Sequence, residues 1–219
     1  MATKLNVYGI SGLGADNRVF KYLNLDNKLI PLDWIEPFNN EPIKKYAKRF
    51  AKNYKLHKEK EFIILGVSFG GLIATEISKL YKPKMTILIS SVETKRELSK
   101  LIKLTGQTKI IKILPKQLLK IPKRIAVFVF GAEKRELLNS IIKDSDVKFT
   151  KWAINELANW NNNTKLENVL KIGGDKDKLL PPKDDATVII KGGEHFMIVD
   201  KANEISRIIN EQLKHITTQ

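Results

Sequence analysis

Short apolar runs alternate with stretches of helical periodicity along most of the chain. Runs of four or five mostly apolar residues, typical of strands buried in a parallel sheet, lie at 62–65, 85–89, 169–172 and 187–190. Segments 4–8 and 28–33 predict two earlier strands. Apolar residues at helical spacing predict helices between the strands and a last helix that Asp200 caps. The pattern therefore predicts an α/β fold, with six strands in a mostly parallel sheet flanked by helices.

Residues 92–163 interrupt this alternation, because helical patterns dominate there and strand–helix–strand units are not visible. The run at 125–130 has the composition of a strand but no partner strand beside it in the sequence, so we expect a buried helix. Trp152 and Trp160 belong to the last helix expected in this block. The sequence therefore predicts a core formed by residues 1–91 and 164–219, with a helical insertion at 92–163.

The stretch from 61 to 81 carries the strongest functional signal. Gly66-Val67-Ser68-Phe69-Gly70 stands between a predicted strand and a predicted helix. So tight a turn strains its tip residue, and the positions two before and two after the tip must be glycine or nearly as small. The tip hydroxyl then projects away from the sheet, toward the free N–H groups and the dipole of the new helix. We therefore predict that Ser68 is the nucleophile of a G-x-S-x-G elbow.

A serine nucleophile needs a base, and the chain has three histidines. His57 lies in a lysine-rich stretch and His215 lies near the C-terminal end, so both are expected to face solvent. His195 directly follows the last predicted strand. Because loops at the carboxyl ends of parallel strands share one crevice with the elbow, His195 is the candidate base.

The base in turn needs a carboxylate that fixes its tautomer and stabilises the imidazolium. Segment 172–181 follows the preceding strand and contains both Asp175 and Asp177. We favour Asp177, while Asp175 remains an alternative acid that could instead face solvent or cap the turn. Glu93, just past the strand at 85–89, is a further alternative acid.

The order Ser68, Asp177, His195 is that of the α/β-hydrolase triad, and the sequence resembles that superfamily from about residue 5 to 213. The resemblance rests on the elbow at 66–70, on Gly-Asp-Lys-Asp-Lys-Leu-Leu-Pro at 174–181 and on Gly-Gly-Glu-His at 192–195. It implies an oxyanion hole formed by the N–H groups of Leu13 and Phe69, although Ser-Gly at 11–12 replaces the His-Gly of many relatives. It also implies that the insertion caps the crevice, and that the first two strands of the full fold are absent.

The activity implied by this resemblance is that of a serine hydrolase, either carboxylesterase-like or thioesterase-like. Such an enzyme cleaves a small-molecule carboxylic ester or thioester through an acyl-enzyme, and it needs no cofactor. One alternative is a catalytically inactive protein of the same fold that binds a ligand or partner.

A second alternative is a dinucleotide-binding reductase, because glycines at 9, 12 and 14, followed by Asp33, approach a Rossmann signature. The position of the third glycine in that signature holds Asn17. A metal hydrolase is not indicated, because the three histidines are widely separated and no H-E-x-x-H motif is present.

Composition adds constraints on partners and location. The net charge is +15, but lysine is scattered and nucleic-acid-binding motifs are not visible, so a solvated basic surface is favoured over nucleic acid. Residues 95–124 hold ten basic residues against one acidic residue, a density that could attract an anionic substrate or an anionic membrane, although a solvated face is again favoured.

The absence of cysteine excludes disulfides and thiol chemistry. Neither a membrane-spanning run nor a signal peptide is visible, so a cytoplasmic location is expected.

Overall fold

The computed structural model describes residues 4–99, 102 and 122–216. Six strands form one sheet in the order β2-β1-β3-β4-β5-β6, and every neighbouring pair is parallel. The strands are β1 (Val7–Ile10), β2 (Leu29–Leu32), β3 (Ile63–Val67), β4 (Met85–Ile89), β5 (Val169–Gly174) and β6 (Thr187–Ile190). The predicted six-stranded α/β fold is confirmed. The first strand begins three residues later than predicted and includes the start of the glycine-rich segment.

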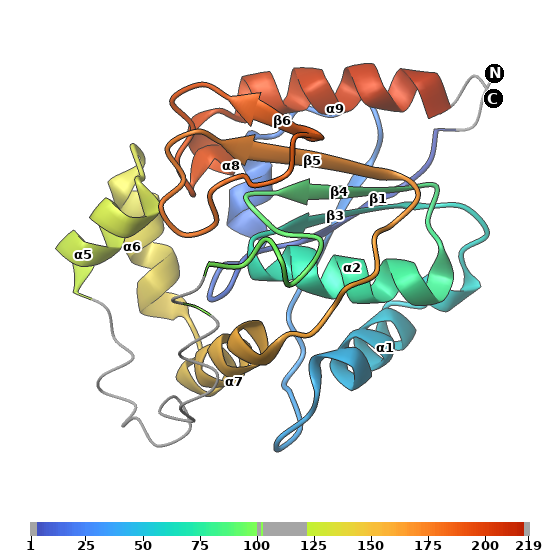
Figure 1. The fold of residues 1–219 in the computed structure, drawn as a ribbon, viewed down its shortest axis with the longest axis horizontal. Helices are drawn as coiled ribbons and strands as arrows, with labels where there is room; N and C mark the ends of the chain where they lie inside the picture. The colour runs from blue at the N-terminus through green and yellow to red at the C-terminus, as the bar shows by residue number, and fades with distance from the viewer. Residues whose placement is uncertain (1–3, 100–101, 103–121, 217–219) are drawn as a thin grey trace.

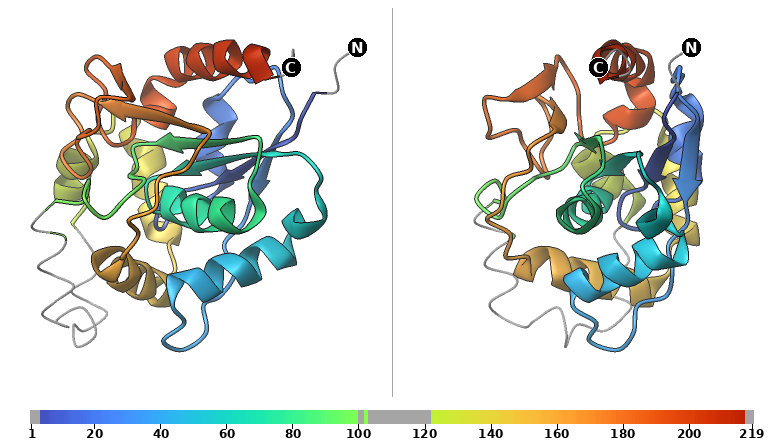
Figure 2. Two further views of the ribbon diagram at one scale, coloured as in Figure 1. Left: turned by 45° about the vertical axis from the view of Figure 1, so that its right-hand side comes forward. Right: turned by 90° about the vertical axis from the view of Figure 1, so that its right-hand side faces the viewer.

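Helices cover both faces of the sheet (Figures 1 and 2). One face packs against α1 (Ile43–Asn53) and α2 (Phe69–Tyr81), with the short 3₁₀ helix η2 (Leu56–Lys58) after α1. The other face packs against the 3₁₀ helix η1 (Asn17–Tyr22), α8 (Met197–Asp200) and α9 (Ala202–Ile216). Successive strand residues point to opposite faces, so Ile64 belongs to the first core while Ile63 and Leu65 belong to the second. Burial on both faces explains why the central strands β3 and β4 are mostly apolar.

The chain between β4 and β5 forms the predicted helical insertion, with helices α5 (Lys123–Phe130), α6 (Arg135–Asp144) and α7 (Val147–Asn159). Residues 92–99 form turns instead of the helical structure predicted for them, and the helices expected at 100–101 and 103–121 lie outside the described residues. Figure 1 shows α5 and α6 beside the end of the sheet at which the strand arrows point. The insertion therefore lies next to the carboxyl ends of the strands. Among the described helices, none is both long enough and apolar enough to cross a membrane.

Two local predictions were wrong. The run at 125–130 is helical as expected but not buried, because Ile125 is 53% exposed and Phe128 is 68% exposed while Ala126 faces the interior. Asp200 does not cap the last helix, since its carboxylate accepts the N–H groups of Glu133 and Lys134 at 2.9 and 3.2 Å. Asp200 therefore ties the start of α6 to the core. The predicted C-terminal helix is divided into α8, which ends at Asp200, and α9, which begins at Ala202.

Candidate active site

Ser68 occupies the turn between β3 and α2 in a backbone conformation that few L-residues adopt, with φ 51° and ψ −121°. A Cβ atom on Gly66 would lie 2.5 Å from the carbonyl oxygen of Gly70, and a Cβ on Gly70 would collide with the carbonyl oxygen of Ser11. Larger residues therefore cannot replace either glycine without moving the backbone. The turn has the geometry predicted for a nucleophile elbow, and the Ser68 side chain is half-buried at its tip.

Three side chains that are far apart in the sequence form one hydrogen-bonded chain. His195 Nε2 lies 2.9 Å from Ser68 Oγ, and His195 Nδ1 lies 2.8 Å from Asp177 Oδ2. The other carboxylate oxygen, Asp177 Oδ1, accepts the N–H groups of Leu179 and Leu180, each at 2.9 Å. These two bonds fix the carboxylate plane so that Oδ2 faces the imidazole. With Asp177 ionised, Nδ1 carries the proton, which leaves Nε2 free to accept the serine hydroxyl proton.

The environment of Asp177 keeps it ionised although it is only 3% exposed. Burial by itself raises the pKa of the Asp177 carboxyl, but the hydrogen bond and charge of His195 and the two backbone N–H groups outweigh this effect. The pKa of Asp177 is therefore lower than its ordinary value. A buried, charged carboxylate next to an imidazole stabilises the imidazolium form, which is the property that general-base chemistry needs.

The loops that carry Asp177 and His195 are tied together directly. The Lys176 N–H donates to the Gly193 carbonyl at 2.9 Å, and Lys178 Nζ lies 2.6 Å from Glu194 Oε1. The insertion supports the same loop, because the Phe130 ring centroid lies 5.6 Å from that of His195. The imidazole is thus held by contacts from three separate segments of the chain.

The predicted oxyanion donors lie on two segments that meet at the serine. Phe69 is the first residue of α2, so its N–H has no acceptor within the helix. A Cβ on Gly12 would lie 3.3 Å from Ser68 Cβ, which places the loop after β1 against Ser68. Leu13 follows Gly12, and its N–H donates to no acceptor within the described part of the chain. The assignment of Leu13 and Phe69 to an oxyanion hole stays a prediction. The positions of their N–H groups are compatible with it.

The loop after β1 is less suited to a dinucleotide. The element that follows it is the 3₁₀ helix η1, capped by the carboxylate of Asp16, which also pairs with Arg18 at 2.7 Å. A Rossmann loop instead places the pyrophosphate at the N-terminus of a longer α-helix, where a carboxylate would repel it.

The alternative acids and the other histidines lie elsewhere. Asp175 is exposed, and its Oδ1 accepts the Gly192 N–H at 2.7 Å, so it closes a turn. Glu93 is buried, but its carboxylate accepts the Leu166 N–H and lies 3.7 Å from Lys171 Nζ. Neither residue contacts His195. His57 and His215 are both exposed, as expected.

Two groups of residues around this site are not predictable from the motifs of the sequence. Ser91 Oγ donates to the carbonyl oxygen of Ser68 at 2.7 Å, which braces the elbow from the end of β4. Lys171, only 4% exposed within β5, lies 2.6 Å from Asp184 and 2.9 Å from Glu97. A lysine inside an otherwise apolar strand was the available signal for this cluster, because a buried ammonium needs carboxylate partners.

The ammonium group of Lys171 already supplies the positive charge at the centre of this cluster. Carboxylate oxygens of Glu93, Glu97 and Asp184 lie within 4.8 Å of one another, a spacing that a metal ion could use, but the ammonium of Lys171 contacts all three groups. We therefore assign the cluster a structural role: it joins β5 to the start of the insertion and to the segment after the Asp177 loop.

Replacing Asp184 with asparagine is expected to lower the free energy of unfolding by about 1.5–3 kcal/mol at neutral pH, because a buried ammonium loses its nearest carboxylate. The hydrogen bond from Lys171 lowers the pKa of Asp184 from 3.8 to about 2. The stabilisation is therefore complete above the unfolded-state pKa and is lost as the pH falls from about 4 toward 2. Urea unfolding at stepped pH should show the difference between the two proteins shrinking across that interval.

Lys165→Gln is the matched control, because Lys165 is the exposed partner of Asp184, at 3.4 Å, and its removal should change stability little. An Asp184→Asn effect that stays constant down to the acid end of the series would contradict the assigned role of the ion pair.

Comparisons with known proteins identify the fold of this chain. No protein-family model and no curated protein matches the sequence. The arrangement of a parallel sheet, an elbow after β3 and a helical insertion after β4 is that of the α/β-hydrolase fold, and the described residues have this fold.

Solved structures with this fold include several esterases and related enzymes. An esterase from Exiguobacterium antarcticum matches with a TM-score of 0.74 and 15% identity, over 98% of this chain and 93% of that one. A putative lipase from Acinetobacter baumannii matches with a TM-score of 0.73 and 18% identity, over 100% and 86% of the two chains. An N-acyl homoserine lactonase complexed with N-butanoyl homoserine has a TM-score of 0.68 and 13% identity, over 100% and 92%. At these identities the likeness shows the fold and not a shared substrate.

Proposed function

We propose that this protein is a serine hydrolase that cleaves a carboxylic ester or thioester through an acyl-enzyme intermediate. The observation that carries the proposal is the hydrogen-bonded chain from Ser68 Oγ through His195 to Asp177, with distances of 2.9 and 2.8 Å. A hydroxyl, an imidazole and a buried carboxylate in this order are the groups that acyl transfer by serine requires. The fold shared with esterases, a lipase and a lactonase supports the same reaction class.

In the proposed reaction, Ser68 Oγ attacks the acyl carbon while His195 Nε2 accepts its proton. Asp177 stabilises the imidazolium through Nδ1–H. The N–H groups of Leu13 and Phe69 stabilise the oxyanion, each contributing about 3 kcal/mol to lowering the barrier. His195 then protonates the leaving group, and afterwards takes a proton from the water that attacks the acyl-enzyme. The hydrogen bonds from Ser68 Oγ to His195 Nε2 and from His195 Nδ1 to Asp177 Oδ2 support the first of these proton transfers.

A panel of p-nitrophenyl esters from acetyl to dodecanoyl, assayed beside acyl thioesters, tests this proposal. We expect saturable hydrolysis of at least one chain length, with activity that depends on Ser68. If the correctly folded protein hydrolyses none of these substrates faster than its Ser68→Ala variant does, the proposal is wrong and a binding role for the same fold is favoured.

A further inference from the structure

A cavity of about 830 Å³ lies between α5, α6 and the loops that follow β5 and β6. It is outside the triad, because neither Ser68 nor His195 lines it, but Glu194 does, and Glu194 immediately precedes the candidate base. Val127 and Phe128 of α5 form an apolar wall, and Phe128 is 68% exposed. A volume of this size is in the range of sites that bind small organic molecules.

The charged groups of this cavity are not balanced. Within the cavity, Lys178 is paired with Glu194 at 2.6 Å. Glu133 also lines the cavity, but its carboxylate lies 3.4 Å from Lys201, a residue that does not line it. Arg124 and Arg135 also line the cavity, and neither has a carboxylate partner within the described residues. Two guanidinium groups are therefore available to an anion, and their planar donor arrangement suits phosphate and carboxylate.

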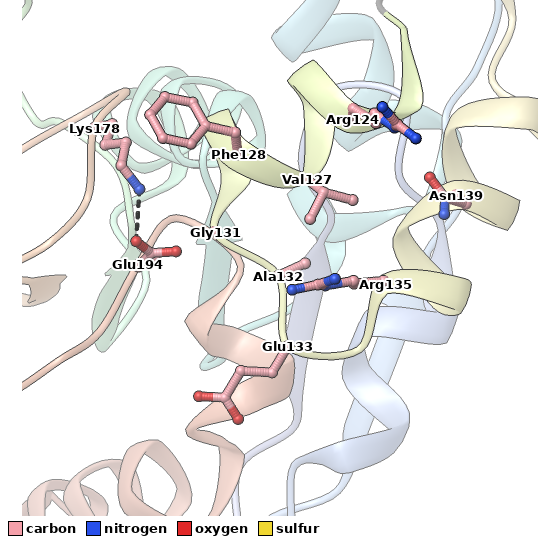
Figure 3. A pocket seen from close by; sticks show the side chains of 10 residues that line it. All are labelled: Arg124, Val127, Phe128, Gly131, Ala132, Glu133, Arg135, Asn139, Lys178 and Glu194. Carbon is pink, nitrogen blue, oxygen red and sulfur yellow. Dashed lines mark hydrogen bonds and ion pairs between the residues drawn. The ribbon is translucent and has the colours of Figure 1, made fainter.

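Figure 3 shows where these groups lie around the cavity. Arg124 of α5 and Asn139 of α6 point toward one another from facing helices, and the Arg135 side chain extends toward Ala132 beneath Val127. The Oδ1 atom of Asn139 is buried without a hydrogen-bond partner among the described residues. A buried acceptor of this kind is costly unless a nearby group donates to it, and the Arg124 side chain points toward Asn139 in Figure 3.

The position of the cavity relates it to one side of the proposed reaction. His195 Nε2 returns its proton to the leaving group, so the leaving group departs beside the His195 loop. Resting on the proposed function, we infer that the cavity binds an anionic group, phosphate or carboxylate, carried by the leaving group of the substrate. Arg124 and Arg135 bind the anion, and the apolar wall of α5 contacts the chain that connects it to the scissile bond.

Matched thioesters with one hexanoyl group test this inference. Hexanoyl-coenzyme A carries phosphates on its leaving group, S-hexanoyl-3-mercaptopropionate carries a carboxylate, and S-hexanoyl-N-acetylcysteamine is uncharged. The ratio of kcat/KM for each anionic thioester to that for the uncharged one measures the preference for an anion, and the two anionic arms separate phosphate from carboxylate. Mono-p-nitrophenyl adipate against p-nitrophenyl hexanoate places the charge on the acyl side instead.

Arg124→Gln and Arg135→Gln are each expected to lower the preference for at least one anionic thioester about tenfold, mainly through KM, since each removes a charge-assisted hydrogen bond. Arg207→Gln removes the same charge from α9, where Arg207 is exposed and pairs with Glu211, and it should leave the preference unchanged. Assays at physiological salt screen long-range attraction to the basic surface. The adipate preference should not respond to any of these variants.

Several results would overturn the inference while leaving the proposed function intact. The first is that the uncharged thioester is hydrolysed and neither anionic thioester is preferred to it. The second is that the preference for an anionic thioester survives both substitutions. The third is that the substitutions lower only the preference for the adipate ester over the hexanoate ester. If no thioester or ester is hydrolysed, the proposed function fails, and calorimetry with coenzyme A and 3-mercaptopropionate still decides the cavity. Binding that weakens about tenfold in Arg124→Gln and Arg135→Gln but not in Arg207→Gln supports the site, and equal or absent binding contradicts it.

Discussion

Replacing Ser68 with alanine is expected to lower kcat by about 10⁵–10⁶ when chemistry limits turnover. The Oγ atom is the proposed nucleophile, and its hydrogen bond to His195 Nε2 at 2.9 Å is the path for its proton. Alanine retains the Cβ atom, and the same backbone strain at φ 51° remains, so we expect the fold to survive. Steady-state kinetics on the best ester of the panel, together with thermal unfolding of both proteins, measure the two effects separately.

Ser91→Ala is the matched control for that experiment. Ser91 Oγ contacts the carbonyl oxygen of Ser68 at 2.7 Å but not the proposed proton path. Loss of this neutral hydrogen bond should cost about tenfold at most. A Ser68→Ala protein that keeps wild-type activity, or a Ser91→Ala protein that loses as much activity as Ser68→Ala, would contradict the assignment of the nucleophile.

Asp177→Asn is expected to lower kcat by about 10⁴, because an amide cannot hold the imidazole in the tautomer that accepts the serine proton. Asp175→Asn should change kcat only a few-fold, since the Asp175 carboxylate contacts the Gly192 N–H and not His195. The lowered pKa of Asp177 keeps its carboxylate charged across the neutral range, so protonation of Asp177 should not limit activity there. The kcat–pH profiles of the wild type and the two variants test both statements.

The same pair of variants distinguishes the acid directly. If Asp175→Asn loses more activity than Asp177→Asn, the acid has been assigned to the wrong residue. A loss shared equally by the two variants would point instead to damage to the loop that carries both.

The sheet was predictable because its order follows from local patterns. Strands buried on both faces are mostly apolar, and the run at 85–89 follows this pattern closely, so β4 has the predicted bounds. The elbow was predictable for a different reason. Gly66 and Gly70 are required by close backbone approaches around Ser68, so their spacing reports a three-dimensional constraint directly in the sequence.

The proximity of Ser68, Asp177 and His195 was also predictable, because the carboxyl ends of neighbouring parallel strands lie at the same edge of a sheet. Their catalytic roles remain predictions, as does the pair of oxyanion donors.

Features that depend on contacts between distant segments were not predictable. Asp200 looked like a helix cap by its local sequence, yet its carboxylate binds backbone N–H groups at the start of α6. Phe128 looked buried by composition, but α5 borders a cavity, and the side chain is largely exposed. Local preference is outweighed in both cases by the position of the insertion relative to the core, which no periodicity encodes.

The central claim is that Ser68 is activated by His195, and labelling with a fluorophosphonate tests it most directly, because such probes react with an activated serine and not with an ordinary hydroxyl. We predict one covalent adduct on the native protein, located by peptide mass spectrometry at Ser68, and no adduct on the His195→Ala variant. A native protein that stays unlabelled, or that is labelled at Ser68 equally well without His195, would contradict the account.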